Sequence, residues 1–102
     1  MKTLDDIRRR LAAGDFEFSR HAFQRAIERN ISEAEIRQAG AQARIIEDYP
    51  DDTYALSSLL LGFTATGRPL HVQASCVDSD MLKIITLYEP DPAEGYDYAR
   101  RR

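Results

Sequence analysis

The chain has 102 residues, of which 43% are hydrophobic and 30% are charged. These proportions are typical of a globular protein and exclude a disordered chain. The length predicts a single domain over residues 1–102, with its core between about residues 4 and 92. The longest apolar run, Leu59–Leu61, is too short to cross a membrane, and no apolar leader follows the charged N-terminus. We therefore expect a cytoplasmic protein without membrane contact.

The formal net charge is −3 and the isoelectric point is near 5.3, so the molecule as a whole does not attract nucleic acid. Any phosphate contact must therefore depend on a local group of arginines, which supply twelve of the fourteen basic residues. The single cysteine, Cys76, excludes an internal disulfide and a multi-cysteine metal module. No close spacing of metal ligands is present, and we expect neither a metal nor a cofactor.

Helical patterns fill the first 43 residues, which contain no proline. Apolar spacing predicts a helix over Leu4–Ala13 that ends at Gly14. A second helix is predicted over Ser19–Arg29 with Ser19 as its N-cap, and Asn30 breaks it. The capping box Ser32–Glu35 opens a third helix that continues to about Ala43.

Short β-branched and aromatic runs, separated by turn residues, follow from Arg44 onward. They predict four strands: Arg44–Tyr49, Tyr54–Phe63, Pro69–Val77 and Met81–Tyr88. Short loops join antiparallel neighbours, and the order of helices before strands is typical of an α+β domain. We therefore expect three N-terminal helices on one face of a four-stranded antiparallel meander.

The register of this sheet separates a polar face from an apolar one. A turn centred on Ser79 and Asp80 pairs Val77 with Leu82, Ser75 with Ile84, Gln73 with Thr86 and His71 with Tyr88. A two-residue turn at Thr66 and Gly67 places Gly62 opposite His71 and turns Leu59, Leu61 and Phe63 toward the core. The polar face, half exposed to solvent, then carries His71, Gln73, Ser75, Thr86 and Tyr88 beside Arg68.

The second helix offers further polar groups. Its predicted apolar arc comprises Ala22, Phe23, Ala26 and Ile27, whereas His21 and Arg25 lie one turn apart on the polar side. Taken alone, His21 is more simply explained as a capping or solvated histidine near a helix start, and Arg25 as a surface partner of Glu28. Whether His21 approaches His71 depends on how the helix docks on the sheet, which the sequence leaves open.

Together these side chains match the needs of metal-independent RNA cleavage. The reaction needs a base for the 2′-hydroxyl proton, an acid for the leaving oxygen and cations for the charged phosphate. Imidazoles and a phenol can transfer protons, and arginine binds phosphate through two parallel hydrogen bonds. We therefore take His71, His21 and Tyr88 as candidate catalytic residues, and Arg25, Arg68, Thr86 and Gln73 as candidate substrate-binding residues.

The same stretches resemble a family of small bacterial domains with the pattern SxHAxxR, GRPLHV and IIT-Y-P. In this chain the matching segments are Phe18–Arg25, Asn30–Ile36, Gly67–Val72 and Ile84–Pro90. The resemblance covers about residues 16–92. That family is similar to the RelE-like and BrnT-like toxin superfamily of small α+β ribonucleases. The resemblance implies a RelE/barnase-like fold, an RNA substrate such as mRNA, and an antitoxin-like partner with a zinc finger or helix-turn-helix.

A second function remains open. The polar sheet face would also suit a non-catalytic module that binds a protein partner or an anion. In a purely structural role, His71 and Tyr88 would be an ordinary cross-strand contact. The last residues, 93–102, combine tyrosines with Arg100–Arg102 and suggest either a flexible basic tail or an accessory contact to RNA.

Overall fold

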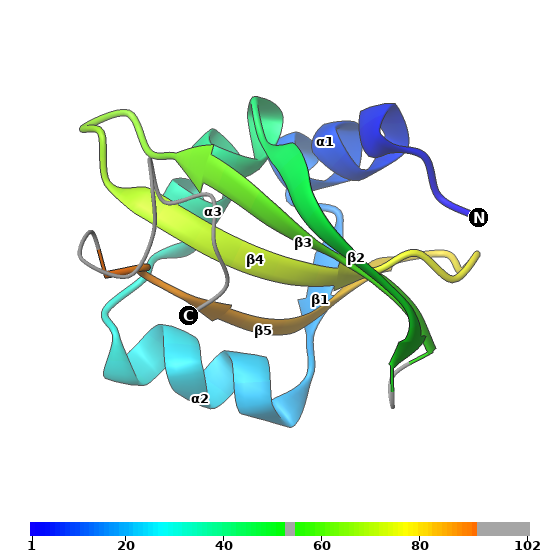
Figure 1. The fold of residues 1–102 in the computed structure, drawn as a ribbon. Coiled ribbons are helices and arrows are strands. Elements are labelled where there is room, and N and C mark those ends of the chain that lie inside the picture. Colours follow the sequence, from blue (N-terminus) through cyan, green and yellow to red (C-terminus); the bar gives the residue numbers. More distant parts are fainter. Residues whose placement is uncertain (53–54, 92–102) are drawn as a thin grey trace.

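The computed structural model describes residues 1–52 and 55–91, and within them it shows an α+β fold (Figure 1). The helices are α1 (Leu4–Ala13), α2 (Arg20–Glu28) and α3 (Glu33–Ala41). The strands are β1 (Phe16–Phe18), β2 (Arg44–Asp52), β3 (Ala55–Phe63), β4 (Pro69–Ser75) and β5 (Leu82–Tyr88). None of these helices is long and apolar enough to cross a membrane. The predicted tail over residues 93–102 lies outside the described residues.

The expected four-stranded antiparallel sheet is wrong in one respect, because the sheet has five strands in the order β1-β5-β4-β3-β2. The additional strand, β1, pairs with β5 in parallel, with Phe16 opposite Leu82 and Phe18 opposite Ile84. Three residues between two helices are too few to show the alternation that marks a strand, and the partner lies 66 positions further along the chain. The other four strands pair antiparallel, as predicted.

The local signals at the helix ends are confirmed. Ser19 caps α2, where its hydroxyl accepts a hydrogen bond from the Ala22 amide. The same hydroxyl donates to the Ile85 carbonyl at 2.7 Å, so the cap also fixes the start of α2 to β5. Ser32 and Glu35 form the predicted capping box of α3. This helix ends at Ala41, two residues earlier than expected.

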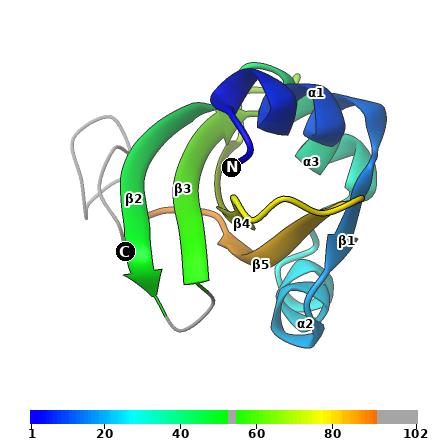
Figure 2. The same ribbon diagram turned by 90° about the vertical axis from the view of Figure 1, so that its right-hand side faces the viewer.

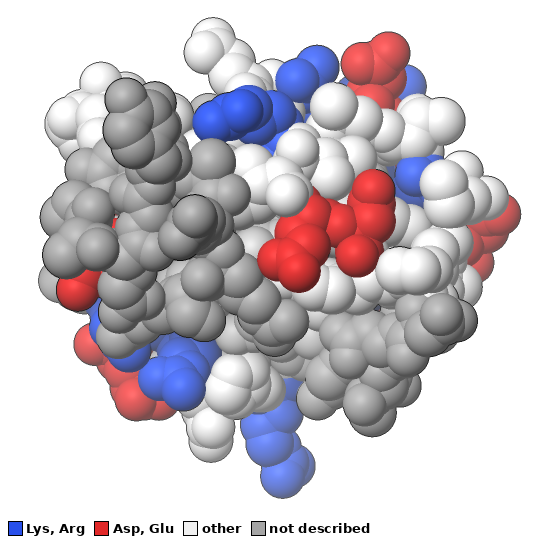
Figure 3. Space-filling model, in the orientation of Figure 1, with Lys and Arg blue, Asp and Glu red and all other residues white. Residues whose placement is uncertain are grey.

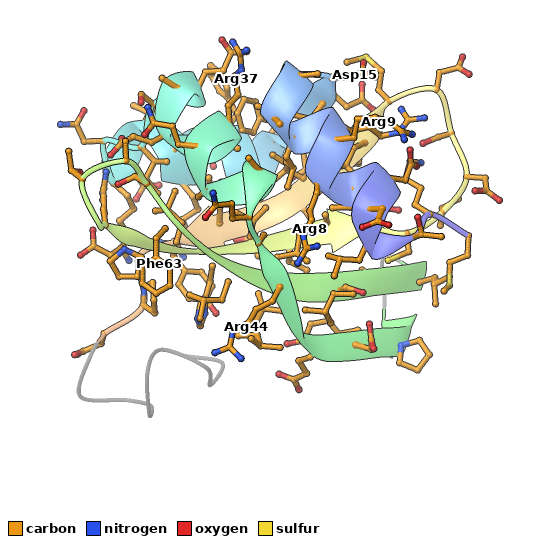
Figure 4. The ribbon with its side chains drawn as sticks, turned by 90° about the horizontal axis from the view of Figure 1, so that it is seen from above. Arg8, Arg9, Asp15, Arg37, Arg44 and Phe63 are labelled. Atoms are coloured by element: carbon orange, nitrogen blue, oxygen red, sulfur yellow. The ribbon has the colours of Figure 1, made fainter. Side chains whose placement is uncertain are left out.

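Two glycines allow the helices to lie close together and close to the sheet. A Cβ at Gly40 would lie 2.3 Å from the Leu11 Cβ, and a Cβ at Gly62 would lie 2.0 Å from the Ala39 carbonyl oxygen. Figure 4 shows α1 and α3 side by side over the strands, with Arg8 pointing from α1 toward the start of β2. Its Nε donates to the Ala43 carbonyl at 2.6 Å. The backbone spacing between α3 and β3 therefore depends on glycine.

The predicted register holds for only part of the sheet. His71 pairs with Tyr88 and Gln73 with Thr86, as expected, but a β-bulge then places Ile84 opposite Ala74 instead of Ser75. The extra residue is Ile85, whose carbonyl accepts the hydrogen bond from Ser19. Because of this shift the predicted pairs Ser75–Ile84 and Val77–Leu82 do not form, and β4 ends at Ser75.

The β3–β4 turn is longer than predicted, and this moves three apolar side chains to the other face. Residues 64–68 connect the strands, closed by a hydrogen bond from the Thr64 amide to the Arg68 carbonyl at 2.9 Å. Leu61 therefore lies opposite His71, and Gly62 opposite Leu70. The helix-facing core contains Leu60 but not Leu59, Leu61 or Phe63, which share the face of His71.

All three helices contribute to one hydrophobic core on one side of the curled sheet (Figure 2). Its members include Ile7 and Leu11 from α1, Ala22 and Ala26 from α2, Ile36 and Ala39 from α3, and Leu70, Val72, Ile84 and Leu87 from the strands. Cys76 is buried there as a free thiol. The opposite side of the sheet is thereby left without a helix among the described residues.

Candidate functional site

The helix-free face of the sheet carries the predicted polar residues, but they are not half-solvated as expected. His71 is fully buried, Gln73 is 3% exposed, and their neighbours Leu59 and Leu61 are buried on the same face. Thr86 and Tyr88 on β5 are partly exposed. The expectation of a half-solvated face is therefore wrong for His71 and Gln73.

His71 and Tyr88 form a direct pair across β4 and β5. The His71 Nδ1 lies 3.1 Å from the Tyr88 hydroxyl oxygen, and the ring centroids are 5.2 Å apart in an edge-on arrangement. Since the imidazole is buried and the tyrosine is partly exposed, the contact fixes the orientation of the phenol. A hydrogen-bonded imidazole–phenol pair can accept or supply a proton at the phenolic oxygen.

Gln73 lies one cross-strand pair further along, opposite Thr86. Its side-chain amide nitrogen donates a hydrogen bond to the Ser57 hydroxyl at 3.1 Å. Ser57 belongs to β3 and is itself buried. This bond satisfies a buried polar group and fixes the amide beneath the surface. Of the four candidate site residues on these two strands, the structure therefore brings His71 and Tyr88 into contact and places Gln73 and Thr86 in the next cross-strand pair.

Arg68 is engaged on all three guanidinium nitrogens within the fold. Its Nε donates to Glu89 at 2.6 Å, its Nη1 to Glu35 at 3.1 Å, and its Nη2 to the Arg29 carbonyl at 2.8 Å. The bond to Glu89 is the main reason that the pKa of Arg68 rises above its ordinary value. The side chain thus joins the ends of β5 and α2 to the first turn of α3, and most of its donors are not available to a phosphate.

The predicted helix residues are exposed and carry no such partners. His21 is exposed and Arg25 half-buried on α2, and neither makes a hydrogen bond or ion pair with any residue that the structure describes. The Arg29 side chain continues their spacing of four residues and is also without an ion pair in the described part of the chain. We name His21, Arg25 and Arg29 the basic stripe of α2.

The arginines of α1 differ from this stripe because they are paired locally. Arg9 bonds to Asp6, while Arg10 bonds to Asp6 at 3.2 Å and to Asp15 at 3.5 Å. Arg8 lies 3.8 Å from Asp5, so each arginine of the run Arg8–Arg10 has a local carboxylate partner, although the charge of this run is more conspicuous in the sequence than that of α2. Sequence reasoning missed Arg29 because its unpaired state depends on the tertiary structure, although its spacing from Arg25 was visible.

The position of α2 decides which way the basic stripe faces. Ala22 and Ala26 are buried, and Phe23 lies on one flank, where its ring centroid is 6.1 Å from that of Phe18 on the helix side of the sheet. His21 and Arg25 lie on the other flank of the same helix. The stripe therefore faces away from Phe18, while α2 itself packs on the helix side of the sheet, opposite to the face that carries His71 and Tyr88.

Charge is unevenly distributed over this side of the molecule. Figure 3 shows acidic side chains near the middle of the face and basic side chains below, where α2 lies in Figure 1. Within residues 1–52 and 55–91 no group of histidine, cysteine and carboxylate side chains is arranged to hold a metal ion. Among these residues the candidate site therefore consists of the His71–Tyr88 pair on the helix-free face and, separately, a row of basic side chains without ion pairs on α2.

Comparison with known proteins identifies a family but no activity. A model of a domain of unknown function, DUF4258, matches residues 18–89, which include α2, the sheet from β2 to β5 and every candidate site residue. No curated protein and no solved structure gives a significant match. The match covers more than half of the sequence, and the chain therefore belongs to the DUF4258 family.

Proposed function

We propose that this protein is a metal-independent endoribonuclease of a bacterial toxin–antitoxin pair, acting in the cytoplasm on RNA such as mRNA. The observation that carries the proposal is the 3.1 Å contact between the Nδ1 of buried His71 and the hydroxyl of partly exposed Tyr88. A buried imidazole that orients a phenol is an arrangement suited to proton transfer. The helix-before-sheet order agrees with a RelE/barnase-like fold as part of the same proposal.

The chemistry divides among three groups. Tyr88, held by His71, exchanges a proton with one of the two reacting oxygens, and His21 serves the other, since an imidazole can both accept and donate a proton. The 2′-oxygen bonds to phosphorus as the bond to the 5′-oxygen breaks, and the proton lost from the first oxygen is matched by one gained by the second. Arg25 stabilises the charged phosphate, while Arg68 acts as a positioning residue because Glu35 and Glu89 hold it.

The test compares wild type with Tyr88→Phe, which removes one hydroxyl and leaves the ring in place. Cleavage of a labelled single-stranded RNA is followed in the presence of EDTA, and host growth is followed under tight induction. We expect Tyr88→Phe to lose about 10²–10³-fold in cleavage rate and to relieve growth arrest. Tyr49→Phe is the matched control, since Tyr49 bonds to Glu47 on β2, two strands away from β4.

A non-catalytic binding module is the second candidate, and the state of Arg68 favours it. An arginine whose three nitrogens are already bonded within the fold adds little to phosphate binding. This function predicts that the purified, folded wild type leaves RNA intact both alone and with ribosomes. It also predicts that wild type and Tyr88→Phe are equally harmless to the host.

A further inference from the structure

An apolar groove runs along the flank of α2 opposite the basic stripe. It has a volume of about 400 Å³ and is lined by Phe18, Phe23, Ala26, Ile27 and Ile31, with residues 30–33 at one end. The groove lies between α2, Phe18 of β1 and the connection that leads into α3. It is separate from His71 and Tyr88, which do not line it.

Two large apolar side chains that line the groove are exposed to solvent. Phe23 is 55% exposed and Ile27 is 65% exposed, although the sequence pattern predicts both in the core. Figures 1 and 2 both show α2 apart from α1 and α3, so its outer side is open. Apolar residues four apart on an open helix are the anchors of a helix that binds in a groove. We name Phe23, Ile27 and the groove beside them the α2 apolar surface.

The charges at its two ends identify the occupant. Arg20, the first residue of α2, lies one turn before Phe23 on the same side of the helix. Glu33 lines the other end of the groove at the first residue of α3. Neither forms an ion pair with a residue that the structure describes. A two-fold axis between Phe23 and Ile27 would place each Arg20 over the 30–33 turn of the other copy, next to its Glu33.

We propose that the α2 apolar surface binds a second copy of this chain, with the two α2 helices antiparallel. Phe23 of each copy enters the groove of the other, and two Arg20–Glu33 pairs border the contact. The surface is self-complementary in shape and in charge, as a two-fold interface must be. The basic stripes stay outside the contact because they lie on the opposite flank of α2, so the proposal does not depend on the proposed function.

Sedimentation equilibrium of the full chain tests the proposal. We expect wild type to sediment as a dimer and Ile27→Glu to sediment as a monomer of 11.6 kDa with an unchanged circular dichroism spectrum. Arg20→Glu and Glu33→Arg should each raise the dimer Kd about tenfold or more, and the double variant should return it to within about threefold of wild type. Arg44→Glu, on the exposed start of β2, is the control and should leave the Kd unchanged.

Three results would overturn the proposal. One is a wild type that remains monomeric up to about 0.5 mM, where even a weak specific dimer would form. Another is a dimer whose Kd does not respond to Ile27→Glu, because the copies would then meet elsewhere. The third is a double variant no better than the two single variants, since the charges would then not face one another.

Discussion

Arg68 and Glu35 meet at 3.1 Å, although 33 positions separate them in the sequence. Glu35 is also the carboxylate of the α3 capping box, so one side chain serves both a helix start and a contact to the β3–β4 turn. Arg68 adds the Arg29 carbonyl at the end of α2 and Glu89 after β5. Through this pair, the helices that flank the candidate site are held in a fixed position relative to its strands.

Replacing Arg68 should therefore lower stability before it affects any reaction. We expect Arg68→Ala to lower the free energy of unfolding by about 2–3 kcal/mol, since several charge-assisted hydrogen bonds are lost together. Arg68→Lys should recover less than half of the free energy of unfolding that Arg68→Ala loses, because a single ammonium group cannot reach all the acceptors that the planar guanidinium group reaches. Urea unfolding measures both. Arg9→Ala, which removes an exposed pair to Asp6, should stay within about 0.5 kcal/mol of wild type.

The pH dependence of stability should report Glu35. The Ser32 amide, and after it Arg68, lower the pKa of this carboxyl below its ordinary 4.5. The stabilisation is therefore fully present above pH 4.5 and is lost as pH falls through the lower folded-state pKa. Urea titrations should find Glu35→Gln about 1 kcal/mol less stable than wild type near neutral pH, with the difference shrinking toward about pH 3. A constant difference at every pH would contradict this.

Gly62 is predicted to tolerate no side chain. A Cβ there would lie 2.0 Å from the backbone oxygen of Ala39, so α3 would have to move away from β3. We expect Gly62→Ala to lower the free energy of unfolding by about 3 kcal/mol and the Tm by roughly 10–20 °C. Gly67→Ala is the comparison, since its φ of 87° is strained but nothing lies within 4 Å. It should cost only about 1 kcal/mol, and equal Tm shifts for the two variants would contradict the packing argument.

The basic stripe should dominate any affinity for RNA. Arg25→Ala and Arg29→Ala should each weaken binding of a labelled single-stranded RNA about three- to tenfold and reduce the slope of log K against log salt by about 0.7. Fluorescence anisotropy at several salt concentrations measures both quantities. Arg9→Ala removes the same charge from a locally paired position and should leave affinity and slope unchanged. If all three variants behave alike, binding follows net charge and not the stripe.

The sequence predicts well what local contacts determine. Ser19 and the Ser32–Glu35 capping box set the starts of α2 and α3, and both signals act within one turn of helix. The predicted β3–β4 register is wrong because Thr66 and Gly67 were assumed to form a two-residue turn, and an error of one residue moves every side chain to the other face. Phe23 was placed in the core because a helical pattern shows which residues are apolar, but not how many partners surround them.

The candidate site divides in the same way. The pairing of His71 with Tyr88 follows from strand alternation and was predicted. The burial of His71 was not, because it depends on how three strands assemble around the ring. Arg68 and Arg25 look alike in the sequence, yet one is bonded on all its nitrogens and the other has no ion pair in the described part of the chain. Only tertiary contacts distinguish an arginine that holds the fold from one that can bind a ligand.

The parallel pairing of β1 with β5 determines when the sheet can form completely during synthesis of the chain. Phe16 finds its partner only when residue 82 has been made, and α2 packs on that same strand. While a ribosome is still adding the fourth strand, the first part of the chain has no β5 on which to dock, and Tyr88 has not yet joined His71. The nascent chain therefore carries every basic residue of α2 without the phenol, and whatever chemistry this site performs begins only after the last strand has left the ribosome.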